Sequence, residues 1–165
     1  MKKVSIFNIK GGVAKTTSTA NLGTCLSQEG KKVLLVDLDP QSNLTKLFKA
    51  YSMDDLTVSD VLLDKHLDIH KVIKKTDFEN IDILPANINL IFADRNILID
   101  NTRSQQKRLS KALKNLNNEY DYCLIDCPPS LNMITTNALC ASDEVFVPIK
   151  IDKFALDRKS TRLNS

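Results

Sequence analysis

Short apolar runs alternate with longer segments of helical periodicity along this chain, and no other feature restricts its fold as strongly. The apolar runs lie at residues 4–9, 32–37, 81–84, 122–126 and 144–150, and the helical patterns at residues 15–28, 44–51, 58–63, 87–99, 105–118 and 131–141. Strands that alternate with helices build βαβ units, in which consecutive strands are parallel. The sequence therefore predicts an α/β fold, with a mostly parallel sheet and helices on both of its faces.

The composition is that of one soluble globular domain. The chain has 165 residues, of which 42% are apolar and 26% charged, and it contains no internal repeat and no linker rich in glycine, proline or serine. Its formal charge of +3 comes largely from Arg158, Lys159 and Arg162, so charge alone does not indicate a nucleic-acid-binding protein. No apolar run is long enough for a signal peptide or a membrane span, and we expect a cytoplasmic protein.

The cysteine pattern favours reduced, buried thiols over a disulfide framework. No two of the four cysteines form a CxxC pair, and all lie in apolar or mixed segments: Cys25, Cys123, Cys127 and Cys140. An iron–sulfur pair at Cys123 and Cys127 is the competing interpretation. On one strand, however, these two thiols would lie about 13 Å apart at ~3.3 Å per residue, which is too far for one chain to chelate a cluster with them.

The first apolar run leads into a polar loop with the sequence KGGVAKTT, residues 10–17, which holds two of the four glycines of the chain. Glycines let backbone N–H groups approach an anion, and the N-terminus of the following helix adds partial positive charge. Lys15 can then reach the β and γ phosphates of a nucleotide, and the Thr16 hydroxyl can bind Mg²⁺. The strict Walker A pattern GxxxxGK[ST] is not met, because Ile9 and Ala14 replace its glycines. A tight turn with solvated lysines is the alternative.

Carboxylates follow two further apolar runs. Asp37 and Asp39 lie at the end of the second run, and Asp126 closes the fourth. Ligands of open parallel sheets bind beyond the carboxyl ends of the strands, and buried carboxylates need a cation or hydrogen bonds. An Mg²⁺-bound nucleotide supplies such a cation. For the Asp37 segment taken alone, a simple turn ended by Pro40 is an equally good interpretation.

Together these segments resemble the deviant Walker ATPases of the ParA/Soj partition family, within the MinD/ParA superfamily. The resemblance rests on KGGVAKTT, VDLDPQSN, LPAN, DCPPS and VPIKIDKFAL. It implies that residues 1–156 are the N-terminal part of a single ATPase domain with a P-loop NTPase-type fold, incomplete at the C-terminus. It also implies ATP hydrolysis with Mg²⁺, an ATP-dependent homodimer, a ParB-like centromere-binding partner, non-specific DNA binding and a nucleoid-associated location, with no membrane expected.

The same resemblance assigns roles to individual residues. Lys10 would be the signature lysine that reaches the partner subunit's ATP, Lys15 the P-loop lysine, and Asp39 the acid that orients the attacking water. The expected metal-binding residues are Thr16, the Walker B acid Asp126, and Asp37 as a supporting residue near Mg²⁺. The expected nucleotide-binding residues are Lys10, Gly11, Gly12, Val13, Ala14, Lys15, Thr16 and Thr17. Ala14 departs from the commoner glycine, and we expect altered loop freedom without loss of binding.

Two other classes share such a loop. A MinD-like membrane-surface ATPase would need a basic amphipathic C-terminal helix, but DLDPQSN and VPIKIDKFAL are closer to the partition ATPases. A reductase similar to the nitrogenase iron protein would bridge a cluster between subunits with one cysteine from each switch region. Only Cys127 is suitably placed for that.

The resemblance stops after Leu156. Residues 157–165, DRKSTRLNS, match the in-frame translation of a common short-read sequencing adapter, GATCGGAAGAGCACACGTCTGAACTCC. We therefore expect a non-native tail on a gene that was cut off, while a natural basic segment is the alternative. An interrupted domain would expose apolar surface and an unpaired sheet edge, so we expect a poorly stable and weakly active product.

Overall fold

The computed structural model describes residues 1–150. Its elements in chain order are β1 (Lys2–Ile6), α1 (Lys15–Gln28), β2 (Val33–Asp37), α2 (Asn43–Leu47), α3 (Val58–Leu63), η1 (Ile69–Lys71), β3 (Lys74–Lys75), β4 (Ile81–Leu84), α4 (Leu90–Ile99), α5 (Arg108–Leu113), η2 (Lys114–Leu116), β5 (Tyr122–Asp126), α6 (Met133–Ala141) and β6 (Glu144–Phe146). The sheet has the strand order β3-β4-β2-β5-β1-β6, and only the β3–β4 pair is antiparallel. The predicted α/β fold is confirmed.

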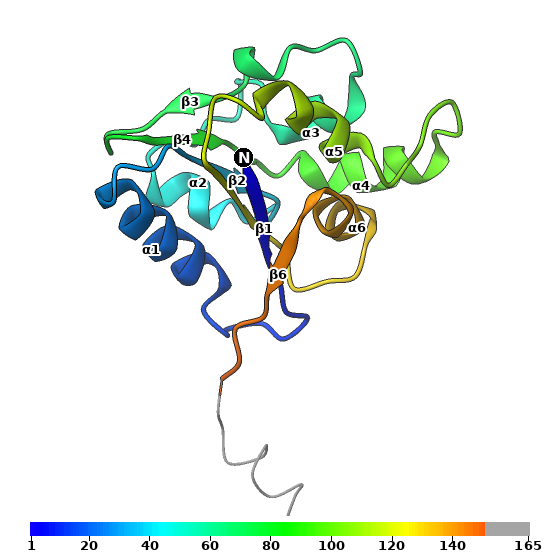
Figure 1. Ribbon diagram of the computed structural model, residues 1–165. Coiled ribbons are helices and arrows are strands. Elements are labelled where there is room, and N and C mark those ends of the chain that lie inside the picture. Colours follow the sequence, from blue (N-terminus) through cyan, green and yellow to red (C-terminus); the bar gives the residue numbers. More distant parts are fainter. Residues whose placement is uncertain (151–165) are drawn as a thin grey trace, which may run out of the picture.

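Helices cover both faces of the sheet because the central strands carry apolar side chains on both sides. In β2 all five residues are buried, and alternate residues enter different cores: Val33 and Leu35 pack with α1 and α2, whereas Leu34 and Val36 pack with α3, α4, α5 and α6. Figure 1 shows α1 and α2 on one side of the sheet and the other four helices on the opposite side. A continuous apolar strand buried on both faces is typical of parallel sheets.

The first strand differs from its predicted range of residues 4–9. β1 begins at Lys2 and ends at Ile6. Asn8 then turns the chain: its Oδ1 accepts from the backbone N–H of Lys10 at 2.9 Å, and its Nδ2 donates to the carbonyl of Pro148 at 2.9 Å. A side chain that satisfies the backbone two residues ahead replaces a ladder hydrogen bond and ends the strand.

Other predicted ranges were too long, and one strand was missed. The helix at residues 105–118 divides into α5 and the short 3₁₀ turn η2, and the strand at residues 144–150 is β6, only three residues long. β3 was not predicted, because two lysines give no apolar pattern and pairing with β4 is a tertiary contact. At α3 the N-cap is Thr57, and Asp60 completes a capping box with it.

The cysteine prediction is half right. Cys123 and Cys127 are buried in the core between the sheet and α3–α6, where burial raises the pKa of each thiol to about 12. Cys25 and Cys140 are exposed on helices, which corrects the expectation of four buried thiols. No disulfide joins them, since all four are free.

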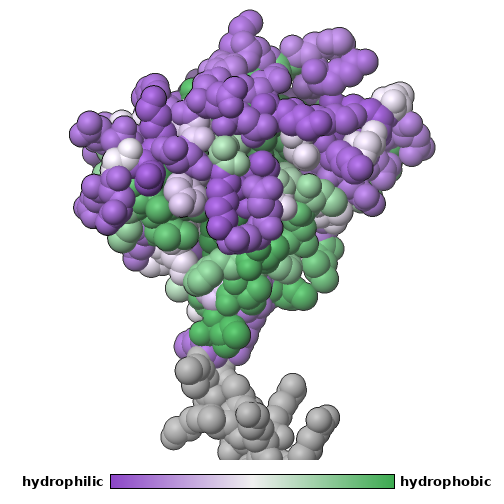
Figure 2. Space-filling model, in the orientation of Figure 1, coloured by the Kyte–Doolittle hydropathy of each residue, from purple (hydrophilic) through white to green (hydrophobic). Residues whose placement is uncertain are grey.

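The end of the sheet formed by β6 is apolar and exposed. All three residues of β6 are exposed, with Val145 at 47% and Phe146 at 50%, and within residues 1–150 the strand pairs only with β1. Figure 2 shows apolar surface gathered around β6 and the segment that follows it. The interpretation of residues 157–165 as an adapter-derived tail lies outside the described residues.

Candidate nucleotide site

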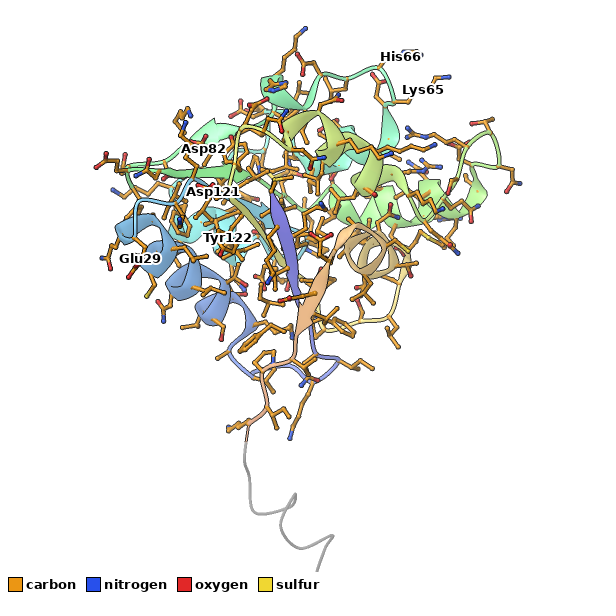
Figure 3. All side chains as sticks on the ribbon, in the orientation of Figure 1. Glu29, Lys65, His66, Asp82, Asp121 and Tyr122 are labelled. Carbon is orange, nitrogen blue, oxygen red and sulfur yellow. The ribbon has the colours of Figure 1, made fainter. Side chains whose placement is uncertain are left out.

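The register of the sheet brings three strand ends together. Asp126, the last residue of β5, is paired with Ile6 of β1 on one side and with Asp37 of β2 on the other. The amino end of β5, where Tyr122 and Asp121 are labelled in Figure 3, lies at the opposite rim of the sheet. The loop after β1 and the carboxylates after β2 and β5 therefore share one rim, as the sequence predicts.

The loop between β1 and α1 is open to solvent and ends on an uncapped helix. Gly11 and Gly12 have no atom within 4 Å of the position of a Cβ, and Gly12 has a positive φ of 68°. Ala14 is also left-handed, with φ 65°. No side chain caps α1 and its first turn contains no acid, so its N-terminal N–H groups can donate hydrogen bonds to an anion.

Ala14 occupies the position where the Walker pattern has its second glycine, and its backbone shows why glycine is common there. A left-handed conformation costs a residue with a Cβ about 1–2 kcal/mol, which glycine avoids. The predicted change in the flexibility of the loop would arise from this left-handed backbone at Ala14, and it stays a prediction. Among the remaining predicted loop residues, Val13 is buried in the turn and Thr17 is exposed.

The two lysines of the loop are placed differently. Lys15 is only 8% exposed, and its Nζ donates to the carbonyl of Lys10 at 3.2 Å. Lys10 itself is exposed at the tip of the loop. The Lys15 ammonium thus lies inside the curve of the loop, whereas the Lys10 side chain is exposed on the surface of the molecule.

Thr16 and Asp126 form the contact that connects the loop to β5. The Thr16 hydroxyl donates to Oδ2 of Asp126 at 2.6 Å. Asp126 is 1% exposed, and its Oδ1 is buried without a hydrogen-bond partner among residues 1–150. The pKa of Asp126 is raised to about 7: burial is the largest cause, the negative charges of Asp37 and Asp39 add to the shift, and Thr16 and Lys15 oppose it. Since both Asp39 and Lys15 act on this carboxylate, all three groups belong to one site.

Asp37 is turned into the protein. Its Oδ1 accepts from the N–H of Asp39 at 3.0 Å, and its Oδ2 accepts from the N–H and the hydroxyl of Thr45 at 2.9 and 2.7 Å. Burial raises its pKa to about 6 despite these bonds. Both oxygens are therefore occupied in holding the turn after β2, which suits a supporting residue behind the metal ligands.

Asp39 lies on that turn and is only partly buried. Its Oδ1 accepts from the N–H of Gln41 at 2.9 Å, and the chain then passes through Ser42 in a left-handed conformation with φ 56° before α2 begins. Its carboxylate is thus held at the mouth of the site by a tight turn.

One positioning residue of the site was missed by sequence reasoning. Thr45 of α2 donates to Asp37 and accepts from the backbone N–H of Ala86 at 2.9 Å, so it joins the turn after β2 to the segment after β4. No motif contains it, and only the tertiary structure brings these segments together.

The donor set fits Mg²⁺ bound together with a nucleotide. Within the described residues no group of three histidine, cysteine or acidic side chains forms a metal cage. Magnesium does not need one, because it keeps several waters and takes one or two protein oxygens plus phosphate oxygens. Asp126 with its unpartnered buried oxygen and the Thr16 hydroxyl are suitable residues to hold it directly or through water.

The chain matches a protein family and curated relatives. The model of the family described as AAA domain matches residues 1–163. The sporulation initiation inhibitor protein Soj of Bacillus subtilis is 46% identical over 165 residues, which are 99% of this chain and 64% of Soj. The chain thus spans a little less than two thirds of the length of this curated relative.

Several similar solved structures carry nucleotides, including these two. The cobyrinic acid a,c-diamide synthase of Mycobacterium smegmatis with bound ATP analog and magnesium has a TM-score of 0.88 and 36% identity, covering 99% of this chain and 66% of that one. A plasmid partition protein of Borrelia burgdorferi bound to AMPPNP has a TM-score of 0.80 and 32% identity, covering 98% of this chain and 68% of that one.

Within residues 1–150 no helix has the length and apolar character to cross a bilayer.

Proposed function

Because the chain belongs to the AAA domain family and, within it, to the ParA/Soj-type partition ATPases, we propose that it binds and hydrolyses Mg²⁺-ATP as a switch in DNA partition. The observation that carries the proposal is the contact of Thr16 with Asp126, whose second oxygen is buried without a partner among residues 1–150. An anionic nucleotide with its cation would fill the open loop beside that contact.

The loop residues bind and orient the phosphates. Backbone N–H groups of residues 11–17 surround the terminal phosphates, and the buried ammonium of Lys15 neutralises charge there. Mg²⁺, held by Thr16 and Asp126, would neutralise charge between the β and γ phosphates. Phosphoryl transfer depends mainly on such positioning and electrostatic stabilisation, so no covalent role for a side chain is needed.

Two residues complete the proposed reaction. Asp39, held at the mouth of the site, orients the water that attacks the γ phosphate. Lys10, exposed at the tip of the loop, reaches the nucleotide of a partner subunit, which makes hydrolysis depend on a homodimer. We propose a ParB-like centromere-binding protein as the partner that triggers turnover and non-specific DNA as the surface that the ATP form binds.

Nucleotide binding is tested on the 165-residue chain with a fluorescent ATP analogue, with and without Mg²⁺. Thr16→Ala and Asp126→Ala should each remove most of the Mg²⁺-dependent gain in affinity. Thr24→Ala is the matched control, because Thr24 lies on the same helix and, among the contacts within residues 1–150, its hydroxyl donates to the carbonyl of Ala20 and not to a residue of the site. Equal Mg²⁺ dependence in all three variants would exclude the proposed metal residues.

The partition role is tested by ATP turnover with DNA and a ParB-like centromere-binding protein. The expected result is stimulation by the two together. Turnover that responds to neither of them would separate this chain from the partition ATPases in function, while leaving the nucleotide site intact.

A further inference from the structure

A small cavity with both apolar and charged walls lies beside α3 and α5, away from the nucleotide site. It has a volume of about 200 Å³, and its walls include the apolar residues Val61, Leu67 and Ile69 and the cationic residues Lys65, Arg103 and Arg108. Figure 1 places α3 and α5 on the far side of the sheet from α1, and Figure 3 labels Lys65 at this rim of the molecule.

The cavity carries an excess of positive charge. Lys65, Arg103, Arg108 and Lys111 line it, and the only acid in its wall is Asp64. Asp100, behind the wall, pairs with Arg108 at 2.8 Å and lies 3.7 Å from Nε of Arg103. Four cationic side chains at the cavity are therefore accompanied by two carboxylates, those of Asp64 and Asp100.

The two arginines are held close together by the end of α3. Arg103 donates through Nη2 to the carbonyls of Leu62 and Leu63 at 2.5 Å each, and Arg108 donates through Nη1 to the carbonyl of Leu62 at 3.3 Å. Burial and the neighbouring charge of Arg108 lower the pKa of Arg103. Two positive charges thus lie side by side, which costs free energy. They share one carboxylate, that of Asp100.

Arg108 also has unused hydrogen-bonding capacity. It is 4% exposed, yet its Nε has no acceptor among residues 1–150. A buried guanidinium without a full set of acceptors is costly. An oxyanion in the cavity that Arg103 and Arg108 line would offset the repulsion between these two guanidinium groups.

The size of the cavity restricts the ligand. Sites for drug-sized ligands have about 300–1,000 Å³, so a cavity of about 200 Å³ is too small for a nucleotide. It accommodates a phosphate, or a carboxylate with a short aliphatic part against Val61 and Ile69.

We propose that the cavity between α3 and α5 is a binding site for a compact oxyanion, a phosphate or a carboxylate, held by Arg103, Arg108 and Lys111. The site is separate from the nucleotide loop. Its ligand would be an anionic metabolite or an acidic chain terminus, which would bind against α3 and α5.

The test is an NMR titration of the ¹⁵N-labelled 165-residue chain at constant ionic strength, first with sodium phosphate and then with N-acetyl-leucine. Saturable shifts are expected at the amides of Ser104, Lys111 and Asn115. Arg103→Gln and Lys111→Gln should each weaken the affinity read from these shifts by about fivefold or more, close to 1 kcal/mol. Which probe binds more tightly distinguishes a phosphate ligand from a peptide-like carboxylate.

Arg95→Gln is the matched control, because Arg95 is exposed on α4 and does not line the cavity. Phosphate shifts at residues 11–17 report the nucleotide loop separately in the same spectra. Lys111 is exposed, so Lys111→Gln keeps the test valid if Arg103→Gln disturbs the end of α3. The proposal is overturned if the cavity amides shift linearly as with chloride, or if both cavity variants behave like Arg95→Gln.

Discussion

At the scale of single residues, the carboxylate of Asp126 meets two opposing requirements. For the proposed metal it must be ionised, yet burial raises its pKa to about 7 and leaves one oxygen without a partner among residues 1–150. A group whose folded pKa is raised from 3.8 stabilises the fold fully at low pH, and this contribution is lost as pH rises toward 7. The site therefore lowers the stability of the chain without ligand, as functional sites often do.

We expect Asp126→Asn to raise the free energy of unfolding at pH 8 without Mg²⁺ by about 1–3 kcal/mol, because each unit of pKa shift corresponds to about 1.4 kcal/mol. At pH 4 the difference should nearly vanish, since the aspartate is then protonated. Urea unfolding at pH 4, 6 and 8 in EDTA measures it. A constant difference at all three pH values would contradict the assigned cause.

The role proposed for Lys10, at the tip of the loop, concerns hydrolysis and not the binding of ATP. In a full-length relative, alanine at the position of Lys10 should leave ATP affinity within about twofold and lower partner-stimulated turnover by about 100-fold, the usual cost of removing a group that stabilises transition-state charge. Parallel binding and phosphate-release assays measure the two effects. Unchanged turnover would exclude Lys10 from the reaction.

The role proposed for Asp39 concerns the attacking water and not the binding of the nucleotide. Replacing it with alanine should trap the ATP-bound state, because ATP still binds but no carboxylate orients the attacking water. Single-turnover phosphate release measures this, with Asp77→Ala as a surface control whose carboxylate pairs only with Lys49 at 3.0 Å among the described contacts. Phosphate release at the wild-type rate would refute the role of Asp39.

At the scale of elements, the position of α1 depends on a close contact with the sheet at Gly23. A Cβ on Gly23 would lie 2.9 Å from Cδ2 of Leu35 and 3.7 Å from Cδ1 of Leu124, and Leu35 is fully buried. The absent side chain sets the distance between α1 and strands β2 and β5. That distance in turn fixes where the N-terminus of α1 lies relative to Asp126.

Gly23→Val should lower the free energy of unfolding by about 2–3 kcal/mol, because a branched side chain overpacks this contact. Gly23→Ala should be close to neutral, since about 1 kcal/mol of helix propensity offsets a smaller clash. Leu22→Val on the exposed face of the same helix controls for β-branching. Thermal unfolding of the three variants checks this, and equal losses for Gly23→Val and Leu22→Val would contradict the close approach.

At the scale of the whole molecule, the sheet is protected unevenly. β3 at one edge is two residues long and consists of lysines, a composition that discourages pairing with another chain. β6 at the other edge is three residues long and exposes Val145 and Phe146 beside Glu144, so this edge presents apolar surface that the lysines of β3 do not. Self-association through β6 is the expected consequence.

Val145→Lys should reduce self-association at high concentration while changing the unfolding midpoint little, because Val145 is 47% exposed. Leu98→Lys is the control, since Leu98 is similarly exposed at 52% but lies on α4. Sedimentation velocity over a range of concentrations measures the effect. If both lysine variants reduce association equally, general surface apolarity and not the β6 edge is responsible.

Local sequence alone determined most elements and the components of the site. The ranges of α1, α3, β4 and β5 coincide with their predicted ranges, because periodicity, caps and turn residues act within a few positions. KGGVAKTT and the acids after β2 and β5 were recognisable because side-chain chemistry is written directly in the sequence.

Tertiary structure decided what depends on contacts between distant segments. Only the register of β5 between β1 and β2 brings Asp126 to Thr16 and Asp37, and only packing shows that Asp37 faces inward to Thr45. The same holds for β3, for the exposed Cys25 and Cys140, and for the arginines that α3 gathers. Burial and pairing across long sequence separations have no local signal, so neither the raised pKa of Asp126 nor the cavity at α3 and α5 could be read from the residues in order.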